Sequence, residues 1–368
     1  MKIIIAGGGT GGHLFPGIAI AEEFKDRGSA DGIVFVGTSH GIEARVIPRE
    51  GYPLKLLKAE GLIGKPFTRK IRALLLFIVS IFDSLRILKE VRPSLVIGVG
   101  GYASVGMVLA ASLKGIPTLI HEQNSVPGFA NKFLGKFADA IAVTYQESIS
   151  SFPQEKTFLT GNPIRKHILN RDERKAFALF PLNEHKFTIL VFGGSLGAHR
   201  INQTMLEALN YLLDLRHNIQ FLHQTGERDA ERVTEGYRSK GFHGIVVPFI
   251  YQMAEAYTAA DMVICRAGAT TLAELTAIGK PALLIPFPYA AANHQEHNAR
   301  KLEDMGAARV ILESRLNGET LAGAIRELVR NAEARREMQK AAVVFGRPDA
   351  AERVVDIAES LIKQQTAK

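Results

Sequence analysis

The stretch KIIIAGGGTGGH at Lys2–His13 decides the fold, together with a second version of it, FTILVFGGSLGA at Phe187–Ala198. Each stretch begins with apolar residues, continues with a run of glycines and ends in helix-compatible sequence, which is the pattern of a strand–turn–helix unit. Glycine N–H groups, which no side chain covers, can cradle a phosphate at the N-terminus of the following helix. Two such units about 185 residues apart predict two α/β domains with a cleft between them.

The bulk composition indicates a globular protein that works in a reducing compartment. The chain has 368 residues, of which 46% are hydrophobic and 22% charged, enough for two hydrophobic cores. Its single cysteine, Cys265, excludes an intrachain disulfide and fits the cytosol. No signal peptide is expected, because the first apolar run, Ile3–Ala6, leads straight into glycines. The longest apolar run, Ala73–Phe82, is about half of the roughly 18–20 residues that cross a bilayer.

Short β-branched runs alternate with helical stretches along the whole chain, which predicts parallel sheets covered by helices on both faces. The expected strands of the first half are Ile3–Ala6, Ile33–Val36, Leu95–Gly98, Thr118–His121 and Ile141–Val143. Those of the second half are Thr188–Phe192, Ile219–His223, Ile245–Val247, Met262–Cys265 and Ala282–Ile285. The fold class is therefore α/β, with two Rossmann-like doubly wound domains facing across a cleft.

The domain boundaries are expected at two turn-rich breaks, GNPIRKH at Gly161–His167 and FGRPD at Phe345–Asp349. They divide the chain into residues 1–164 with 347–368 and residues 165–346.

The first loop matches the spacing Gly7-x-Gly9-x-x-Gly12 of a dinucleotide fingerprint, but a nicotinamide cofactor is disfavoured. Such a site needs an acidic residue at the end of the second strand, and here none follows that strand before Glu43. The chain also has no GxxxxGK[ST] loop and no Asp-x-Asp pair, and its histidines, including His294 and His297 three residues apart, lack matching metal ligands. No cofactor or metal is therefore expected. Five glycines between Gly7 and Gly12 are more than a turn requires, which favours close approach of a ligand.

Polar residues follow other predicted strands of the first half, where ligands of parallel sheets bind. His13 stands at the start of a helix, which favours a neutral imidazole able to accept a proton, although a scaffolding role is about as well supported. GVGGYASVG at Gly98–Gly106 and HEQN at His121–Asn124 follow two further strands. A solvated loop is the alternative for HEQN.

In the second half, RAGATTLAE at Arg266–Glu274 places Glu274 in the first turns of a helix, where its carboxylate could bind ribose hydroxyls. Compensation of the helix dipole is its alternative role. The segment PFPYAAANHQEHNA at Pro286–Ala299 offers His294 or Gln295 to sugar hydroxyls.

The net charge of +8 is concentrated in one segment. Between Gly61 and Arg92, seven basic residues stand against two acidic ones around LLLFIVSIF, which favours attachment to a membrane surface over nucleic-acid binding. A helix from Thr68 is expected to turn one face to the core: Ile71, Leu74, Leu75, Ile78, Phe82 and Leu85. The apolar residues left over, beside Lys65, Arg69, Lys70 and Arg72, are Leu76, Phe77 and Val79. A helix buried on two sides is the alternative.

Taken together, these motifs resemble the MurG family of bacterial N-acetylglucosaminyltransferases. The matching motifs, in order along nearly the whole chain, are GGTGGH (Gly8–His13), GGY (Gly100–Tyr102), HEQN (His121–Asn124), GNP-x-R (Gly161–Arg165), GGS-x-GA (Gly193–Ala198) and Arg266–Glu274 with Gln295. As a set they are specific, although each alone is weak. Two positions depart from the pattern, since Leu196 and His294 stand where glutamine is common in the family.

The resemblance implies a metal-independent, inverting glycosyltransferase of the B-type fold that makes lipid II for peptidoglycan synthesis. N-acetylglucosamine (GlcNAc) would pass from UDP-GlcNAc to the 4-hydroxyl of lipid I, undecaprenyl-pyrophosphoryl-MurNAc-pentapeptide. The protein would work as a peripheral protein on the cytoplasmic face of the cell membrane, docked through the 62–92 region, with no nucleic-acid partner.

The resemblance also assigns residues. His13 would be the catalytic base, with Asn124 also at the catalytic centre. The donor-binding residues would be Thr10, Gly11, Gly12, Asn124, Arg165, Ser195, Ile250, Ala269, Thr270, Thr271, Leu272, Ala273, Glu274 and Gln295. The acceptor-binding residues would be Gly100, Gly101, Tyr102 and His121.

Other functions remain compatible with these motifs. Another glycosyltransferase of the same fold, such as one acting on diacylglycerol, would share the donor motifs. A UDP-GlcNAc 2-epimerase would act on UDP-GlcNAc alone and need no membrane patch. A non-catalytic nucleotide-sugar-binding or membrane-anchoring subunit would be expected to lack HEQN and the residues of the first loop. A nicotinamide oxidoreductase is the most distant alternative.

Overall fold

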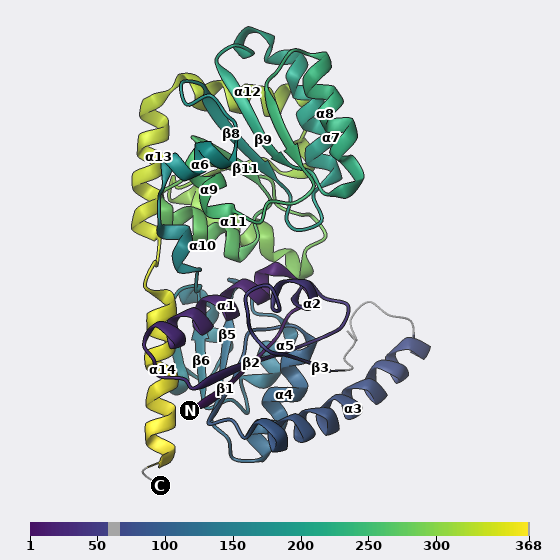
Figure 1. Ribbon diagram of the computed structural model, residues 1–368, viewed down its shortest axis with the longest axis vertical. Coiled ribbons are helices and arrows are strands. Elements are labelled where there is room, and N and C mark those ends of the chain that lie inside the picture. The colour runs from purple at the N-terminus through teal and green to yellow at the C-terminus, as the bar shows by residue number, and fades with distance from the viewer. Residues whose placement is uncertain (58–66, 367–368) are drawn as a thin grey trace. The chain divides into compact units, whose positions relative to one another are not determined.

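The computed structural model describes residues 1–57 and 67–366, with the backbone alone for 67–76 and 366. Within these residues the chain forms two compact units (Figure 1). The first unit comprises Met1–Arg165 and Arg347–Lys368, and the second comprises Lys166–Gly346. Each unit contains one sheet in which every pair of neighbouring strands is parallel. The predicted fold class, two parallel-sheet α/β domains, is confirmed.

The sheet of the first unit has the strand order β3-β2-β1-β4-β5-β6-β7 among the described residues. Its strands are β1 (Lys2–Ala6), β2 (Gly32–Gly37), β3 (Leu54–Leu56), β4 (Leu95–Gly98), β5 (Thr118–Glu122), β6 (Ala140–Val143) and β7 (Thr157–Leu159). Its helices are α1 (Gly11–Asp26), α2 (Glu43–Val46), α3 (Phe67–Val91), α4 (Tyr102–Leu113), α5 (Phe129–Leu134) and α14 (Ala350–Thr366). The chain turns back between β1 and β4, which places the switch point of the topology there.

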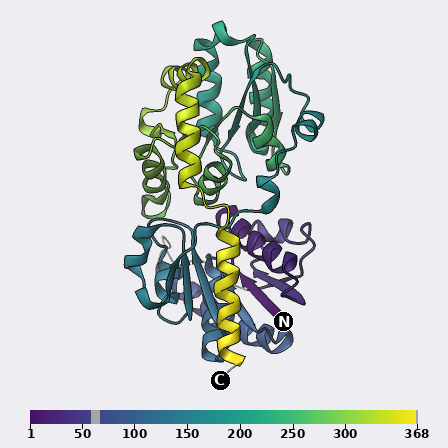
Figure 2. The ribbon, with the colours of Figure 1, turned by 90° about the vertical axis from the view of Figure 1, so that its left-hand side faces the viewer.

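Strand β1 shows why this sheet is buried on both faces. Ile3 and Ile5 pack with α1 and α14 on one face, whereas Ile4 and Ala6 pack with α3 and α4 on the other. All four side chains are fully buried, as expected where successive side chains of a strand point to opposite, helix-covered faces. Figure 2 shows the yellow helix α14 lying across the first face.

The second unit repeats this plan with the strand order β10-β9-β8-β11-β12-β13 in the described chain. Its strands are β8 (Phe187–Phe192), β9 (Ile219–Gln224), β10 (Gly244–Val247), β11 (Met262–Cys265), β12 (Ala282–Leu284) and β13 (Arg309–Val310). Its helices are α6 (Glu173–Leu179), α7 (His199–Ala208), α8 (Ala230–Ser239), α9 (Met253–Ala259), α10 (Ala269–Ile278), α11 (His294–Asp304), α12 (Gly318–Arg330) and α13 (Ala332–Phe345). The glycine-rich loop after β8 takes the place that the loop after β1 has in the first sheet.

All ten predicted strands are confirmed, and three more strands within residues 1–57 and 67–366 were missed. The missed strands are β3, β7 and β13, and each lies at the edge of its sheet. Each has only two or three residues and none of these is fully buried. An edge strand covers one neighbour only, so it carries little of the apolar pattern by which interior strands are recognised.

Helix α3 buries a different face from the predicted one. Ile78 and Phe82 were expected in the core but are 46% and 68% exposed, so this prediction is wrong. Ser80 and Ser84 are buried instead, because Gly106 of α4 approaches so closely that a Cβ on it would lie 2.6 Å from Oγ of Ser80. Small residues therefore form the contact between the two helices. The same face continues with buried apolar residues: Ile87, Leu88 and Val91.

The other residues of the predicted α3 pattern divide into two groups. Leu85 is half-buried against the core, and Val79 is 39% exposed, as expected of a residue left outside the core. Phe77, also expected outside the core, is half-buried. The remainder lie outside the described side chains: Lys65, Arg69, Lys70, Ile71, Arg72, Leu74, Leu75 and Leu76. Within residues 1–57 and 67–366, no helix combines the length and apolarity needed to span a bilayer.

Candidate functional site

Four neighbouring strands of the first sheet, β2, β1, β4 and β5, send their loops to the same edge. Ligands of parallel sheets bind at this carboxyl edge, next to the switch point of the topology. The loop after β1 carries Thr10 and leads into the first turn of α1, which holds His13, and the loop after β4 carries Gly100 and Gly101. The strand order therefore brings these predicted residues together with HEQN, of which His121 and Glu122 end β5 while Gln123 and Asn124 follow it.

The loops after β1 and β4 interlock because both consist of glycine at the contact. A Cβ on Gly101 would lie 2.6 Å from the carbonyl oxygen of Gly8, and one on Gly100 would lie 2.5 Å from Nδ1 of His13. Gly100 and Gly101 also have φ values of +99° and +80°, which favour glycine. Both residues were predicted to bind the acceptor. In this structure the absence of side chains on Gly100 and Gly101 leaves room for the His13 ring and for the backbone of the first loop.

The Nδ1 atom of His13 lies 3.1 Å from Oε1 of Gln123. The amide nitrogen of Gln123 donates to the carbonyl of Val99 at 2.9 Å and to Nδ1 of His121 at 3.1 Å. Because both amide hydrogens are committed in this way, the oxygen is the atom that faces His13, and it can only accept. His13 therefore carries its proton on Nδ1 and leaves the lone pair of Nε2 to accept another.

The other HEQN side chains form the support of this arrangement. His121 is fully buried and donates from Nε2 to the carbonyl of Gly161 at 3.0 Å. Burial lowers the pKa of His121 to about 4, so the ring is neutral near pH 7. Glu122 accepts from the backbone N–H of Asn124 at 2.9 Å and from the side chain of Asn131 at 2.9 Å. Of the four, Asn124 alone is half-buried rather than buried, so it is the side chain presented to a ligand.

The remaining predicted residues of the first unit lie at the same edge. Thr10 is exposed, and Gly11 and Gly12, both half-buried, form the first turn of α1. Tyr102, at the start of α4, is 45% exposed. Arg165 is buried, with its guanidinium carbon 4.2 Å from the centre of the Phe15 ring of α1, within cation–π distance.

In the second unit, Gln224 ties the glycine-rich loop to the segment after β10. Its amide nitrogen donates to the carbonyl of Gly194 at 2.7 Å, and its oxygen accepts from the backbone N–H of Ile250 at 2.8 Å. Ser195 is half-buried beside this anchor, and Leu196 is 85% exposed. Because the N–H of Ile250 is used internally, a ligand would be read by its carbonyl.

The segment Ala269–Glu274 forms the first turns of α10, after β11. Glu274 is 5% exposed and accepts from the hydroxyl of Tyr257 at 2.9 Å. Thr270 and Leu272 are buried, whereas Thr271 and Ala273 are half-buried. Leu272 packs in the core of the unit, so a ligand could meet only its backbone.

Gln295 lies in the first turn of α11, after a strained loop. Its oxygen accepts from the backbone N–H of Phe287 at 3.0 Å. Ala292 and Asn293, just before it, have φ values of +49° and +53°. Such values are uncommon outside glycine, and for alanine they cost free energy that the surroundings must offset. Nδ1 of His294 donates to the carbonyl of Ala291 at 2.7 Å.

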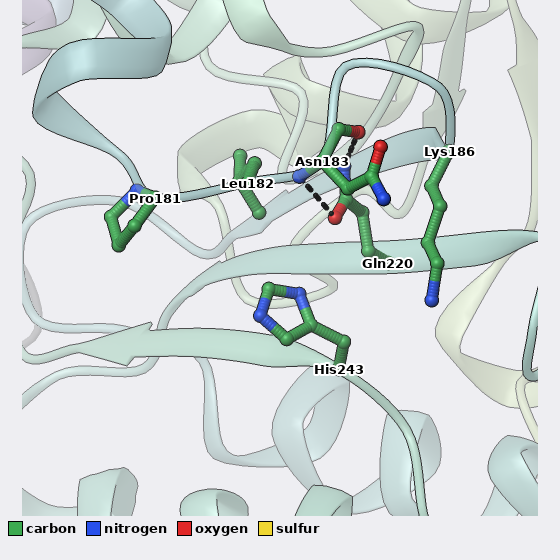
Figure 3. Close-up of a pocket in the computed structure, with 6 residues that line it drawn as sticks. All are labelled: Pro181, Leu182, Asn183, Lys186, Gln220 and His243. Carbon is green, nitrogen blue, oxygen red and sulfur yellow. Dashed lines mark hydrogen bonds between the residues drawn. The ribbon is translucent and has the colours of Figure 1, made fainter.

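A hollow of about 450 Å³ lies at the opposite edge of the second sheet, where the strands begin (Figure 3). Gln220 at its centre is engaged with Asn183, from whose backbone N–H it accepts at 3.0 Å, and with Thr188. The polar groups of Gln220 therefore hold the fold together rather than bind a ligand. No three His, Cys, Asp or Glu side chains within the described residues gather in a group that could hold a metal ion.

Two residues that organise these loops were missed by the sequence reasoning. Glu43 accepts from the backbone N–H of Gly9, and Gln224 holds Gly194 and Ile250. Gln224 ends β9 in the run His223-Gln224-Thr225, and polar residues at the end of a buried strand were a usable signal there. Glu43 was noted only as too distant in sequence for a cofactor.

Comparison with known proteins agrees with this geometry. Residues 3–143 match the N-terminal domain of glycosyltransferase family 28, and residues 188–354 match its C-terminal domain. A protein of Thermodesulfovibrio yellowstonii is 53% identical over 99% of this chain and 100% of its own length. The chain belongs to glycosyltransferase family 28. A Myxococcus xanthus member is 50% identical over 99% of this chain and 94% of its own. Both relatives are named UDP-N-acetylglucosamine--N-acetylmuramyl-(pentapeptide) pyrophosphoryl-undecaprenol N-acetylglucosamine transferase.

Solved structures place the family in a wider fold group. MurG of Acinetobacter baumannii has 31% sequence identity and a TM-score of 0.74, covering 98% of this chain and 99% of its own. A putative UDP-N-acetylglucosamine 2-epimerase of Listeria monocytogenes is similar in structure, with a TM-score of 0.73 over 99% of this chain and 97% of its own. Its sequence identity is only 16%, so this likeness shows the fold alone.

Proposed function

We propose that this glycosyltransferase moves GlcNAc from UDP-GlcNAc to the 4-hydroxyl of the MurNAc-pentapeptide of lipid I and so makes lipid II for peptidoglycan synthesis. Near-full-length identity of 50–53% to transferases named for this reaction supports the choice of substrates. The observation that carries the chemistry is the environment of His13. Its ring is seated on Gly100, and its proton is held on Nδ1 by Gln123.

His13 acts as the general base in a single displacement. The 4-hydroxyl oxygen of MurNAc forms a bond to the anomeric carbon of GlcNAc as its proton passes to Nε2 of His13. The bond from that carbon to the diphosphate oxygen breaks, and UDP leaves with the electron pair. One displacement from the opposite side inverts the configuration. Asn124, the presented side chain of HEQN, contacts the reacting groups beside His13.

The second unit binds the donor, and protein donors rather than a metal stabilise its diphosphate. Ser195 and the backbone N–H groups of its loop hold the charge that develops on the departing diphosphate. The carbonyl of Ile250 accepts from the uracil ring, Glu274 binds ribose hydroxyls, and Gln295 binds the sugar. The start of α10, residues 269–274, borders the same site. Thr10, Gly11, Gly12 and Arg165 of the first unit are proposed as further residues that contact the donor.

The first unit, residues 1–164 with 347–368 in the predicted division, binds lipid I on the cytoplasmic face of the membrane. Gly100, Gly101 and Tyr102 border the acceptor. His121 affects acceptor binding indirectly, through the loop that its side chain supports. The surface that docks on the membrane is the α3 patch, formed by Ile78, Val79 and Phe82. These apolar side chains are exposed, whereas Ser80 and Ser84 of the same helix are buried. A helix that only packed against the core of its unit would bury its apolar side chains and expose its serines.

Replacement of His13 tests the mechanism. With radiolabelled UDP-GlcNAc and a short-chain lipid I analogue, without added metal and with a chelator present, the wild-type protein should transfer label. His13→Ala should lower kcat by about 10²- to 10⁴-fold with little change in donor affinity. Normal turnover by His13→Ala would refute the base. Conversion of UDP-GlcNAc without acceptor would indicate an epimerase, and donor binding without transfer would indicate a binding subunit.

Vesicles test the docking surface separately. Replacement of Ile78, Val79 and Phe82 together by serine should abolish binding to vesicles containing anionic lipid while leaving transfer to a soluble acceptor analogue intact. The control is Leu213→Ser, which removes a side chain that is 49% exposed in the second unit. Unchanged vesicle binding by the triple variant, or by charge reversal at Arg69, Lys70 and Arg72, would refute this surface.

A further inference from the structure

The carboxylate of Glu43 lies against the first glycine-rich loop but takes no part in the reaction described above. Glu43 begins α2, and its side chain is 1% exposed. Its Oε2 accepts from the backbone N–H of Gly9 at 2.7 Å. Its Oε1 accepts from both the N–H and the hydroxyl of Thr38, each at 2.8 Å. Two segments that follow neighbouring strands, β1 and β2, are therefore joined by one buried carboxylate.

Three glycines leave the space that this carboxylate fills. A Cβ on Gly8 would lie 2.3 Å from Cδ of Glu43, one on Gly37 would lie 2.5 Å from Cγ, and one on Gly41 would lie 2.0 Å from Oε2. Real Cβ atoms essentially never approach another atom within 3.0 Å. Much of the glycine in these two segments is thus explained by an anion that belongs to the chain itself.

A backbone N–H in a glycine-rich loop after a first strand is the type of group that holds a phosphate in other proteins. Here the N–H of Gly9 already has an anionic partner. We infer that Glu43 is a built-in anion that holds the first glycine-rich loop in the conformation needed for transfer. It fills the place that a bound phosphate takes elsewhere, so this N–H does not serve a substrate phosphate. The inference rests on the proposed role of His13.

The anchor acts on His13 through a short stretch of backbone. Gly8 and Gly9 have φ values of +146° and +85°, so this part of the loop has the wide conformational freedom of glycine. Thr10 follows directly, and its carbonyl accepts from the N–H groups of His13 and Leu14 at 3.2 and 3.1 Å. Fixing Gly9 therefore fixes where α1 begins and where the His13 ring lies. Glu43 is a positioning residue.

The three donors around Glu43 require an acceptor at both oxygens. Glutamine has nearly the same shape, but its amide group would set an N–H against the N–H of Gly9 or of Thr38. Alanine would leave the donors without their partner and open a space lined by glycine. A small carboxylate such as formate has the size and charge to enter that space. These differences make the role testable with one position.

The experiment measures kcat for transfer with and without added formate. Glu43→Ala should lower kcat by about 100-fold, which is the scale expected when a catalytic group is misplaced. Added formate should then raise the kcat of this variant by about tenfold. Glu43→Gln should lose activity without any response to formate, because its side chain occupies the space. The matched control is Glu23→Ala, which removes another buried carboxylate of the same unit, paired with Arg27 at 2.5 Å. It should lower Tm but show no gain of kcat with formate.

Normal kcat in Glu43→Ala would overturn the inference, and so would a loss of kcat that formate does not reverse, since that result fits a structural role alone. If Glu43→Ala does not fold, Thr38→Val decides instead. It removes one of the three hydrogen bonds and should lower kcat about fivefold with Tm maintained; unchanged kcat would overturn the anchor. Parallel measurement of His13→Ala separates the anchoring role of Glu43 from the proposed catalytic role of His13. Inactive His13→Ala with active Glu43→Ala rejects only the anchor, whereas active His13→Ala rejects the proposed mechanism.

Discussion

Oε1 of Gln123 accepts a hydrogen bond from Nδ1–H of His13 at 3.1 Å, and this neutral partner determines which nitrogen of His13 can act as a base. A carboxylate in that place would stabilise the charged imidazole as well as orient it. An amide orients the ring without that electrostatic stabilisation. The pairing therefore suits a base that must be neutral before each turnover and must release its proton afterwards.

Gln123→Leu should separate orientation from basicity. The variant keeps a side chain of similar size but removes the acceptor of the Nδ1 proton, so both tautomers of His13 become accessible. We expect kcat to fall by about tenfold, the scale of one lost hydrogen bond, with little change in the KM for UDP-GlcNAc. A loss as large as that of His13→Ala, accompanied by a lower Tm, would show instead that Gln123 mainly supports the fold.

Gly100→Ala should damage the site by displacing the same ring. A Cβ there would lie 2.5 Å from Nδ1 of His13. We expect a loss of kcat of about 100-fold, because a displacement of about 1 Å at a catalytic group is enough for such a loss. The matched control is Gly115→Ala, since Gly115 also has a positive φ, of +66°, but no atom within 4 Å of the added Cβ. Both variants should lose stability from backbone strain, and only Gly100→Ala should lose kcat.

Gln224→Leu should weaken donor binding more than it slows the chemical step. Without this amide, the carbonyl of Gly194 and the N–H of Ile250 lose their shared partner, and two parts of the proposed donor site become less rigid. We expect the KM for UDP-GlcNAc to rise about tenfold. The control is Gln220→Leu at the other end of β9, where the amide donates to Asn183 (Figure 3) and also to Thr188. An equal rise of KM in both variants would argue for a general loosening of the sheet.

The interior of each sheet could be predicted from the sequence, because strands buried on both faces have nearly continuous apolar runs, as Ile3–Ala6 does. The edge strands β3, β7 and β13 could not, since a run such as Leu54–Leu56 is only partly covered. The contact face of α3 was misread for a different reason. Hydrophobic periodicity places the largest side chains in the core, but the close approach of Gly106 selects Ser80 and Ser84 there.

Part of the candidate site was predictable, because polar residues at the carboxyl ends of predicted parallel strands are recognisable as ligand-binding candidates. His13 and Asn124 stand out in this way. Glu43 did not, because its partner Gly9 is 34 residues away and their contact depends on the pairing of β1 with β2. Gly100 was predicted to contact the acceptor, but its contact with the His13 ring was not foreseen, since a sequence shows that a glycine is needed without showing which atom needs the space.

A buried histidine in the second unit should make stability depend on pH. Burial lowers the pKa of His223 from 6.5 to about 3, while its ring contacts the hydroxyl of Tyr237 and the side chain of Asn202, both at 3.0 Å. The unfolded chain binds a proton at this residue below pH 6.5 and the folded chain does not. The free energy of unfolding should therefore be highest above pH 6.5 and fall as pH decreases from 6.5 towards 3, by up to about 1.4 kcal/mol per pH unit.

Urea unfolding at pH 7 and pH 4.5 checks this dependence, with hydrogen exchange of β9 peptides to follow the second unit. His121 in the first unit, whose pKa burial lowers to about 4, adds a loss of the same sign, so the comparison is between variants rather than between pH values alone. His223→Gln should be less stable than wild type at pH 7 yet lose less stability on acidification. His217→Gln, which replaces an exposed histidine, should keep the wild-type dependence. An undiminished loss in His223→Gln would mean that other groups, such as the carboxylate of Asp229, control the acid response.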